Sequence, residues 1–167
     1  WLSLGPESEI AFTDFEFKEK NSRTISYDLK KGQLAANIRQ KIKEGGVSFR
    51  TRFTSMGIRG TKILMNYREF KGSGISEYAV MEGEAEVTSS KGEALKLTSG
   101  ERIVLIENEK TKEELVERLK LTAEDLENFS SPEAEEDKGI KPLMPYYEPK
   151  ALSVTSTDIA GEKVERK

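Results

Sequence analysis

The chain of 167 residues contains no cysteine and no histidine. Without cysteine it has no disulfide, no thiol nucleophile and no thiolate metal ligand. Without histidine it lacks the commonest metal ligand and the side chain that most often serves as a general base near neutral pH. A site built from carboxylates, lysines and tyrosines remains open, but the composition argues against an enzyme. We therefore expect no catalytic residues, no metal site and no cofactor.

The sequence also lacks a long apolar run. No stretch of about 18 consecutive apolar residues is present, so we expect no membrane span within these residues. The chain begins with Trp1, and it shows no basic region followed by an apolar stretch, so we recognise no signal peptide. We interpret the sequence as a mature protein or a fragment of a longer product. Any membrane association would then come from regions outside this chain.

Apolar residues are few but patterned. They make up 35% of the chain against 34% for charged residues, which is polar for a folded domain but not typical of a disordered one. At this length the chain can form one domain with a core, plus additional segments.

Residues 5–106 show the alternation of polar and apolar residues that is typical of β-strands. Residues 25–29 alternate as a half-buried strand should, and Lys31-Gly32 marks a turn after them. The apolar phase switches within residues 10–17, which predicts a β-bulge or a turn near Thr13-Asp14. Turn signals recur throughout this region, as in an all-β sandwich, barrel or solenoid.

The pattern changes after residue 109. The segments 111–114 and 122–125 both have the spacing of a helix capping box, and an apolar stripe at helical spacing lies between them. We predict one or two short helices within residues 110–129. The remaining residues, 130–167, form an acidic, Pro-rich tail, and its segment 142–147 is too apolar for a free linker. The expected organisation is thus a β-domain over 1–109, a helical segment and an extended tail.

Charge is distributed unevenly along the chain. Residues 18–52 contain ten Lys or Arg against three Asp or Glu, whereas residues 107–137 contain twelve acidic residues against four basic ones. Two solvated faces are the simpler interpretation, and electrostatic complementarity within the fold or between copies is the alternative. The net charge of −3 and the lack of interleaved aromatic residues argue against nucleic acid. The candidate partner-binding residues are Lys41, Lys43, Arg50, Arg52, Tyr146 and Tyr147.

The most informative stretch is Met56-Gly57-Ile58-Arg59-Gly60-Thr61. Its two glycines permit tight backbone paths, and Thr61 can hydrogen-bond within the turn. Arg59 carries five donors in a fixed fork, so we interpret it as an internal staple of the fold, with a ligand anion as the alternative partner. Gly83 can take a positive φ in a predicted hairpin centred on Glu82-Gly83, and together with Gly100 it completes the set of structural turn residues.

Three glutamates alternate at positions 82, 84 and 86 and would share a face if they lay on one strand. Three carboxylates on one face could hold a divalent cation. No Asp-rich loop accompanies them, so an exposed polar face is the favoured interpretation.

The order of these motifs resembles the FecR domain, a β-rich module of bacterial cell envelopes. The Arg-Gly-Thr turn is followed by a Val-x-Glu-Gly-x-x-x-Val segment at 80–87 and a Leu-x-x-Gly-Glu turn at 97–101. A Gly-x-x-Ser turn at 5–8 and a Leu-x-x-Gly-x-Leu step at 29–34 precede it. The resemblance implies two packed β-layers coiled in a solenoid-like way, in which the Arg-Gly-Thr turn is a signature of the fold and not a catalytic site.

The best-known FecR proteins are inner-membrane regulators that relay an outer-membrane transport signal to a sigma factor. This chain departs from them, since it has no membrane span, no N-terminal helical sigma-binding segment and a different C-terminal part. We therefore expect a non-catalytic periplasmic scaffold or interaction module of a bacterial envelope assembly, which binds envelope proteins or a second copy of itself. The alternative is the periplasmic sensory part of a FecR-type transmembrane anti-sigma regulator. A cupin-like enzyme is a third hypothesis, against which the absence of histidine argues.

Overall fold

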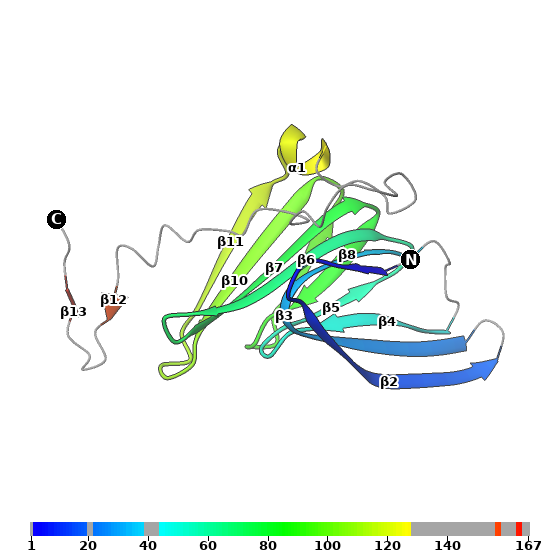
Figure 1. Ribbon diagram of the computed structural model, residues 1–167, viewed down its shortest axis with the longest axis horizontal. Helices are drawn as coiled ribbons and strands as arrows, with labels where there is room; N and C mark the ends of the chain where they lie inside the picture. The colour runs from blue at the N-terminus through cyan, green and yellow to red at the C-terminus, as the bar shows by residue number, and fades with distance from the viewer. Residues whose placement is uncertain (1, 20–21, 39–43, 128–155, 158–162, 165–167) are drawn as a thin grey trace.

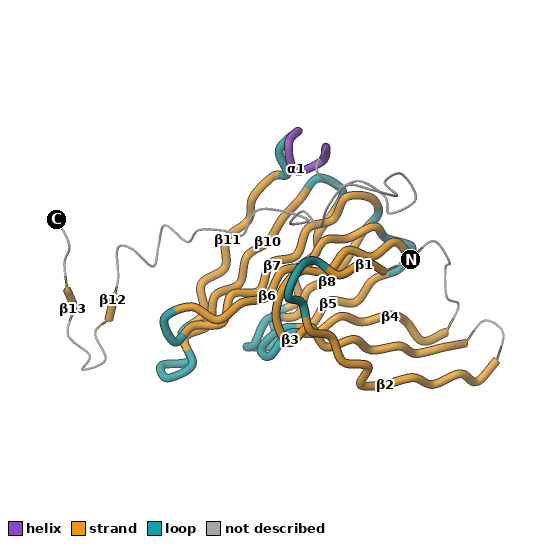
Figure 2. Tube along the Cα trace, viewed as in Figure 1, coloured by secondary structure: helices purple, strands orange, loops and turns teal. Residues whose placement is uncertain are grey.

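The computed structural model describes residues 2–19, 22–38, 44–127, 156–157 and 163–164. Nearly all of these residues are in β-strands, which form a curled sheet folded into two facing layers (Figure 1; Figure 2). One short helix follows the strands. The prediction of an all-β, two-layer fold followed by a short helix is confirmed.

One layer, called layer A here, has the strand order β11-β10-β7-β6-β3-β1, and all of its neighbouring strands are antiparallel. Its members are β1 (Leu2–Leu4), the second half of β3 (Ser22–Asn37), β6 (Lys62–Phe70), β7 (Ser73–Glu82), β10 (Glu101–Asn108) and β11 (Glu114–Lys120).

The facing layer, layer B, has the order β9-β8-β5-β4-β3-β2, in which only β3 and β4 are parallel. Its members are β2 (Glu9–Glu19), the first half of β3, β4 (Glu44–Arg50), β5 (Ser55–Ile58), β8 (Glu84–Thr88) and β9 (Ala94–Thr98). Two very short strands, β12 (Ser156–Thr157) and β13 (Lys163–Val164), pair with each other.

Successive hairpins alternate between the two layers. The hairpins β4-β5 and β8-β9 belong to layer B, and β6-β7 and β10-β11 belong to layer A. The chain therefore crosses between layers after β5, β7 and β9, at residues 59–61, Gly83 and Ser99-Gly100. We call these three crossings the arches. Gly83 was predicted to lie in a hairpin, but β7 and β8 pair with different neighbours in different layers, so the turn is an arch instead.

The arches lie against one another at one end of the sandwich. Gly83 has the predicted positive φ, of 92°, and a Cβ atom placed on it would lie 2.9 Å from the carbonyl oxygen of Gly60. The hydroxyl of Thr61 donates to the carbonyl of Glu84 at 2.8 Å, and the Gly83 N–H donates to Ser99 Oγ at 3.0 Å. The middle arch therefore contacts both of its neighbours, and Gly83 is required there because no side chain fits.

Strand β3 belongs to both layers. Its residues 22–28 pair with β4 in layer B, and its residues 32–37 pair with β6 in layer A. The bend lies at Gly32, whose φ is 94° and whose Cβ position lies 2.2 Å from the hydroxyl of Ser8. The same hydroxyl accepts the N–H of Gln33 at 2.8 Å. Lys31-Gly32 is therefore a bend within one long strand, and not the predicted turn between two strands.

The hydrophobic core fills the space between the layers. Layer A contributes buried side chains from alternate positions of β3, β6, β7 and β10, and layer B contributes those of β4, β5, β8 and β9. This alternation is the period-2 pattern that a strand with one buried face requires. The largest fully buried side chain is that of Tyr78, and its burial raises the pKa of the phenol well above the ordinary value.

A chain of hydroxyl groups ties the layers together at the end opposite the arches. Tyr78 Oη lies 2.6 Å from Thr54 Oγ1, which lies 2.9 Å from Thr51 Oγ1. Thr51 Oγ1 in turn lies 2.7 Å from Ser76 Oγ. Buried polar groups that satisfy one another in this way fix the β4-β5 turn of layer B against β7 of layer A.

The same end is closed by the ring of Phe53, which covers Gly74. A Cβ atom at Gly74 would lie 2.2 Å from that ring, so only glycine allows this contact. Ser73 and Gly74 are buried members of β7. The hairpin turn contains only Lys71 and Gly72, both with positive φ.

Residues 114–120 form strand β11, which corrects the prediction of one or two helices within residues 110–129. The predicted capping box at Thr111 does not form, because the side chain of Asn108 accepts the N–H groups of Lys110 and Thr111 and shapes a hairpin turn. β11 pairs with the edge of β10 along its whole length, and this pairing outweighs the local preference for helix. Its residue Arg118 donates to the carbonyl of Lys96, which links the edges of the two layers.

The second capping box does form and starts α1 (Ala123–Glu127). Thr122 donates its N–H to Asp125 Oδ2 at 2.8 Å, and the Asp125 N–H donates to Thr122 Oγ1 at 3.1 Å. Among the described residues, no helix has the length and apolar character needed to cross a bilayer. Apart from β12 and β13, the predicted tail lies outside the described part of the chain.

The arches give a first testable prediction. Gly83→Ala should lower the free energy of unfolding by about 1–3 kcal/mol, because alanine resists a left-handed φ and its Cβ would press on the Gly60 carbonyl. Gly57→Ala is the matched control, since a Cβ at Gly57 meets nothing within 4 Å, and it should be neutral or stabilise by up to about 1 kcal/mol. Urea denaturation of both variants measures the difference. Equal losses would show that the arch places no special demand on position 83.

Candidate interaction site

The predicted staple residue, Arg59, is exposed in the first arch. Its neighbour Ile58 points into the core, so the alternation of the strand directs Arg59 outward. Within the described part of the chain its guanidinium has no hydrogen bond or ion pair. The prediction of an internal Arg59 staple is therefore wrong, and the hydroxyl of Thr61 holds the arch instead.

The predicted turn glycines have different roles. Gly60 and Gly100, which were predicted to be turn residues, have positive φ values of 62° and 84° and lie in arches. Gly57 instead lies inside β5 with open space around it, so its predicted role in a tight backbone path is wrong. Next to Gly100, the carboxylate of Glu101 accepts the Thr98 N–H at 2.7 Å, and this hydrogen bond lowers the pKa of the carboxyl.

The two arginines proposed to bind a partner contact other residues of the same fold. Arg52 forms ion pairs with Glu69 and Glu109, so it joins the basic N-terminal half of the chain to the acidic segment. Arg50 donates to Ser26 Oγ at 3.3 Å on the outer face of layer B. Both side chains are exposed, and surface pairs of this kind contribute little to stability.

The other four candidates, Lys41, Lys43, Tyr146 and Tyr147, lie outside the described residues. The structure thus brings the predicted turn residues together, apart from Gly57, but it does not gather the predicted partner-binding residues into one site.

The three alternating glutamates do not share one strand. Glu82 ends β7 in layer A, whereas Glu84 and Glu86 lie on β8 in layer B, because the arch at Gly83 separates them. All three side chains are exposed. Among the described residues, no three acidic side chains come close enough together to hold a metal ion.

An aromatic ladder leads from the core to the edge of layer B. The buried ring of Phe49 stacks on Tyr27 with centroids 5.0 Å apart and an interplanar angle of 12°. Tyr27 in turn contacts Phe12 on the neighbouring strand, again at 5.0 Å. Phe12 is 69% exposed, so the ladder ends in solvent.

Phe15 lies further along the same edge and is 70% exposed. The register pairs Phe12 with Tyr27 and Phe15 with Ile25, and it leaves Thr13 unpaired in a β-bulge. This confirms the bulge predicted from the phase switch near Thr13-Asp14. Its consequence is that both phenylalanines lie on the core-facing side of layer B. We call Phe12, Phe15, Ile25 and Tyr27 the aromatic edge.

The aromatic edge is uncovered because layer B is longer than layer A at this corner. Strand β2 and the adjoining parts of β3 and β4 extend beyond the strands of layer A (Figure 1). Along its other side, β2 has no pairing partner among the described strands. An exposed apolar face on a free strand edge is unusual for a natural protein, because it invites pairing with another chain.

The outer face of layer B differs strongly from the aromatic edge. It is shallowly hollowed, with a volume of about 1090 Å³ and a floor of Gly46, Ser48 and Gly57. This floor presents no aromatic or long aliphatic side chain that could anchor a partner. The aromatic edge is therefore the better candidate for protein binding, and sequence analysis missed it, although the phase switch in residues 10–17 was the signal that could have shown it.

A buried ion pair lies on the face of layer A that points away from layer B. Arg102 Nη2 donates to Glu77 Oε2 at 2.7 Å, and Asn66 Nδ2 donates to the same oxygen at 2.8 Å. The Glu77 side chain is only 1% exposed. Burial raises the pKa of Glu77, while the Arg102 charge and the Asn66 hydrogen bond oppose that rise. The pair holds β6, β7 and β10 together in one layer.

No family model matches the sequence, and no curated protein matches it either. The fold is similar to two solved structures of a putative anti-sigma factor from Parabacteroides distasonis. The first is 16% identical, with a TM-score of 0.54 over 76% of this chain and 54% of that one. The second is 14% identical, with a TM-score of 0.50 over 77% of this chain and 64% of that one.

These similarities establish a shared fold, because the sequence identities are low. The chain spans between 54% and 64% of the length of the two proteins it matches. The shared part covers about three-quarters of this chain.

The buried ion pair predicts a pH-dependent stability. Because the folded-state pKa of Glu77 is raised, the folded chain keeps this proton to a higher pH than the unfolded chain, and the free energy of unfolding falls as pH rises through that window. Arg102→Leu removes the opposing charge, so this fall should become larger, with a total loss of about 3–5 kcal/mol at neutral pH. Urea denaturation at acidic and neutral pH measures both effects.

The control is the double variant Glu77→Leu/Arg102→Leu. It removes both charges of this pair, so it should recover part of the stability and lose the added pH dependence, while the amide of Asn66 loses its acceptor. If Arg102→Leu alone is as stable as the parent protein at neutral pH, Arg102 does not compensate the charge of Glu77.

Proposed function

We propose that this chain is a non-catalytic protein-binding module of a bacterial anti-sigma regulator and acts as its sensory part in the periplasm. The observation that carries the protein-binding role is the aromatic edge, where Phe12 and Phe15 are about two-thirds exposed on β2, a strand that pairs with β3 on one side and with no described strand on the other. Aromatic side chains of this kind are the usual anchors of protein interfaces.

The regulatory role draws its support from the fold. The two solved structures that resemble this chain are each described as a putative anti-sigma factor, and the likeness covers about three-quarters of this chain. The motif order that resembles the FecR domain favours the same class of regulator. Because the chain spans only part of those proteins, the proposal concerns this module within a larger regulator.

The non-catalytic character rests on composition. The chain has no cysteine and no histidine, so it lacks the side chains that most often act as nucleophile or general base near neutral pH. A scaffold subunit of an envelope assembly remains the second candidate, because the aromatic edge would serve a structural partner equally well.

Removing the module from the full-length gene tests the choice between these functions. When the regulator lacks its sensory part, the sigma factor encoded beside it should no longer respond to the inducing signal. Transcript levels from the target promoters of that sigma factor measure the response. The full-length protein with Gly57→Ala, at comparable abundance on an immunoblot, is the control and should respond normally.

A scaffold would give a different result. Transcription would then stay responsive without the module, while an envelope complex would fall apart on a native gel. The regulator proposal would be overturned if no sigma-factor gene lies beside this gene and removal of the module changes no transcript levels.

A further inference from the structure

We propose that the free edge of β2 binds an extended peptide as an additional strand of layer B, and that this peptide alternates apolar residues with lysine or arginine. The inference rests on the proposed function in that it takes the partner to be a protein, and it specifies the chemistry by which that partner is recognised. Strand addition of this kind combines main-chain hydrogen bonds with side-chain pockets at alternate positions.

The apolar face of the site is small. Two phenylalanines that are 69% and 70% exposed present roughly 200–350 Å² of ring surface. A standard protein–protein interface buries about 800 Å² on each partner, so the rings alone cannot hold a folded protein. Main-chain pairing must supply the remaining contact, and β2 has the length for it, since it spans eleven residues.

The position of the rings also favours strand addition. The bulge at Thr13 places Phe12 and Phe15 on one side of β2, and layer A does not cover this side (Figure 1). A peptide strand added beside β2 would direct alternate side chains to the same side, next to these rings. Tyr27 supports Phe12 from the core, so the surface is present before the partner arrives.

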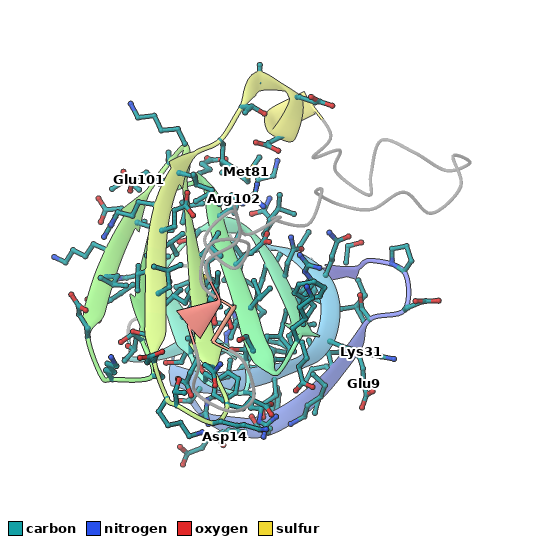
Figure 3. All side chains as sticks on the ribbon, turned by 90° about the vertical axis from the view of Figure 1, so that its left-hand side faces the viewer. Glu9, Asp14, Lys31, Met81, Glu101 and Arg102 are labelled. Atoms are coloured by element: carbon teal, nitrogen blue, oxygen red, sulfur yellow. The ribbon has the colours of Figure 1, made fainter. Side chains whose placement is uncertain are left out.

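Charge selects the partner. Among the residues of β2 whose side chains the structure describes, 9–16, Glu9, Asp14 and Glu16 are acidic and none is basic. Glu9 lies beside Lys31 of β3 (Figure 3), whereas Asp14 pairs in register with the uncharged Ser26 and is exposed. Opposite charges on neighbouring strands attract and like charges repel, so a basic peptide fits this edge.

The same charges disfavour a second copy of this chain. Two β2 strands placed side by side would bring acidic residues next to acidic residues. Acidic residues and a bulge on an edge strand are also known devices against self-pairing. The acidic residues of β2 therefore disfavour pairing with a second copy of β2, while the exposed aromatic face can still contact a basic strand.

A peptide titration of the purified chain tests the proposal. The probe is a capped octapeptide of alternating valine and lysine, and the comparison peptide alternates valine and glutamate. The lysine peptide should shift the backbone amide signals of β2 and β3 in NMR spectra and bind about tenfold more tightly than the glutamate peptide. A lysine peptide with N-methylated backbone amides should fail to bind, because it cannot form the ladder.

Variants of β2 sharpen the test. Phe15→Thr should weaken binding of the lysine peptide, and Asp14→Lys/Glu16→Lys should reverse the preference between the two peptides. The matched controls are Leu115→Thr, at an exposed apolar position of β11, and Glu84→Lys/Glu86→Lys, at two exposed acidic positions of β8. Both controls should bind as the parent chain does.

Three results would overturn the proposal: no binding at β2, equal binding of the two peptides, or signal shifts confined to β9 and β11. Sedimentation that shows a dimer dissociated by Phe15→Thr would assign the edge to a second copy instead. The transcription experiment is independent of this titration. If the lysine peptide does not bind but removal of the module abolishes the response of the sigma factor, only the β2 site is rejected. If the peptide binds but removal of the module leaves that response unchanged, only the regulator role is rejected.

Discussion

The close approach of Gly83 to the backbone of Gly60 and Thr61 is the contact on which the rest of the fold depends. It lets the chain cross between layers in a single residue. Each hairpin can therefore pair, edge to edge within its layer, with the hairpin two places earlier in the chain. With a side chain at this position the middle arch would have to move away from its neighbour. The hydrogen bonds of Thr61 to Glu84 and of Gly83 to Ser99 would then be lost together. A stack of hairpins that share one core therefore depends on three crossings that touch each other.

Sequence analysis predicted what depends on local pattern and missed what depends on which strands pair with each other. The period-2 alternation, the positive φ of Gly83 and the bulge near Thr13 are encoded within a few residues, and all three are confirmed. The arch at Gly83 looked like a hairpin, because nothing nearby shows that β7 and β8 pair with other strands. The strand β11 looked like a helix because its own residues have helical apolar spacing and a capping-box pattern, and the pairing with the preceding strand β10 overrides that local preference.

The candidate site depends on strand lengths, which explains why it could not be predicted. Phe12 and Phe15 have the pattern of core residues, and they would be buried if layer A extended as far as β2 does. Their exposure follows from the difference in reach between the two layers. Arg52 shows the opposite case, since it looked free to meet a partner but has Glu69 and Glu109 as neighbours. Exposure of an apolar residue and pairing of a charged one are both properties of the assembled fold.

The rigidity of the aromatic edge follows from its connection to the core. Phe49 is fully buried, Tyr27 stacks on it, and Phe12 contacts Tyr27, so the position of an exposed ring is set by a packed interior. A partner that binds a preformed surface loses less of its binding energy to ordering than one that must fold a loop. An edge strand supported in this way differs from an ordinary frayed edge, because its free hydrogen-bonding groups are held in register by β3. The pairing with β3 and the packing of Phe12 on Tyr27 therefore hold the exposed edge of β2 in a conformation that can pair with another strand.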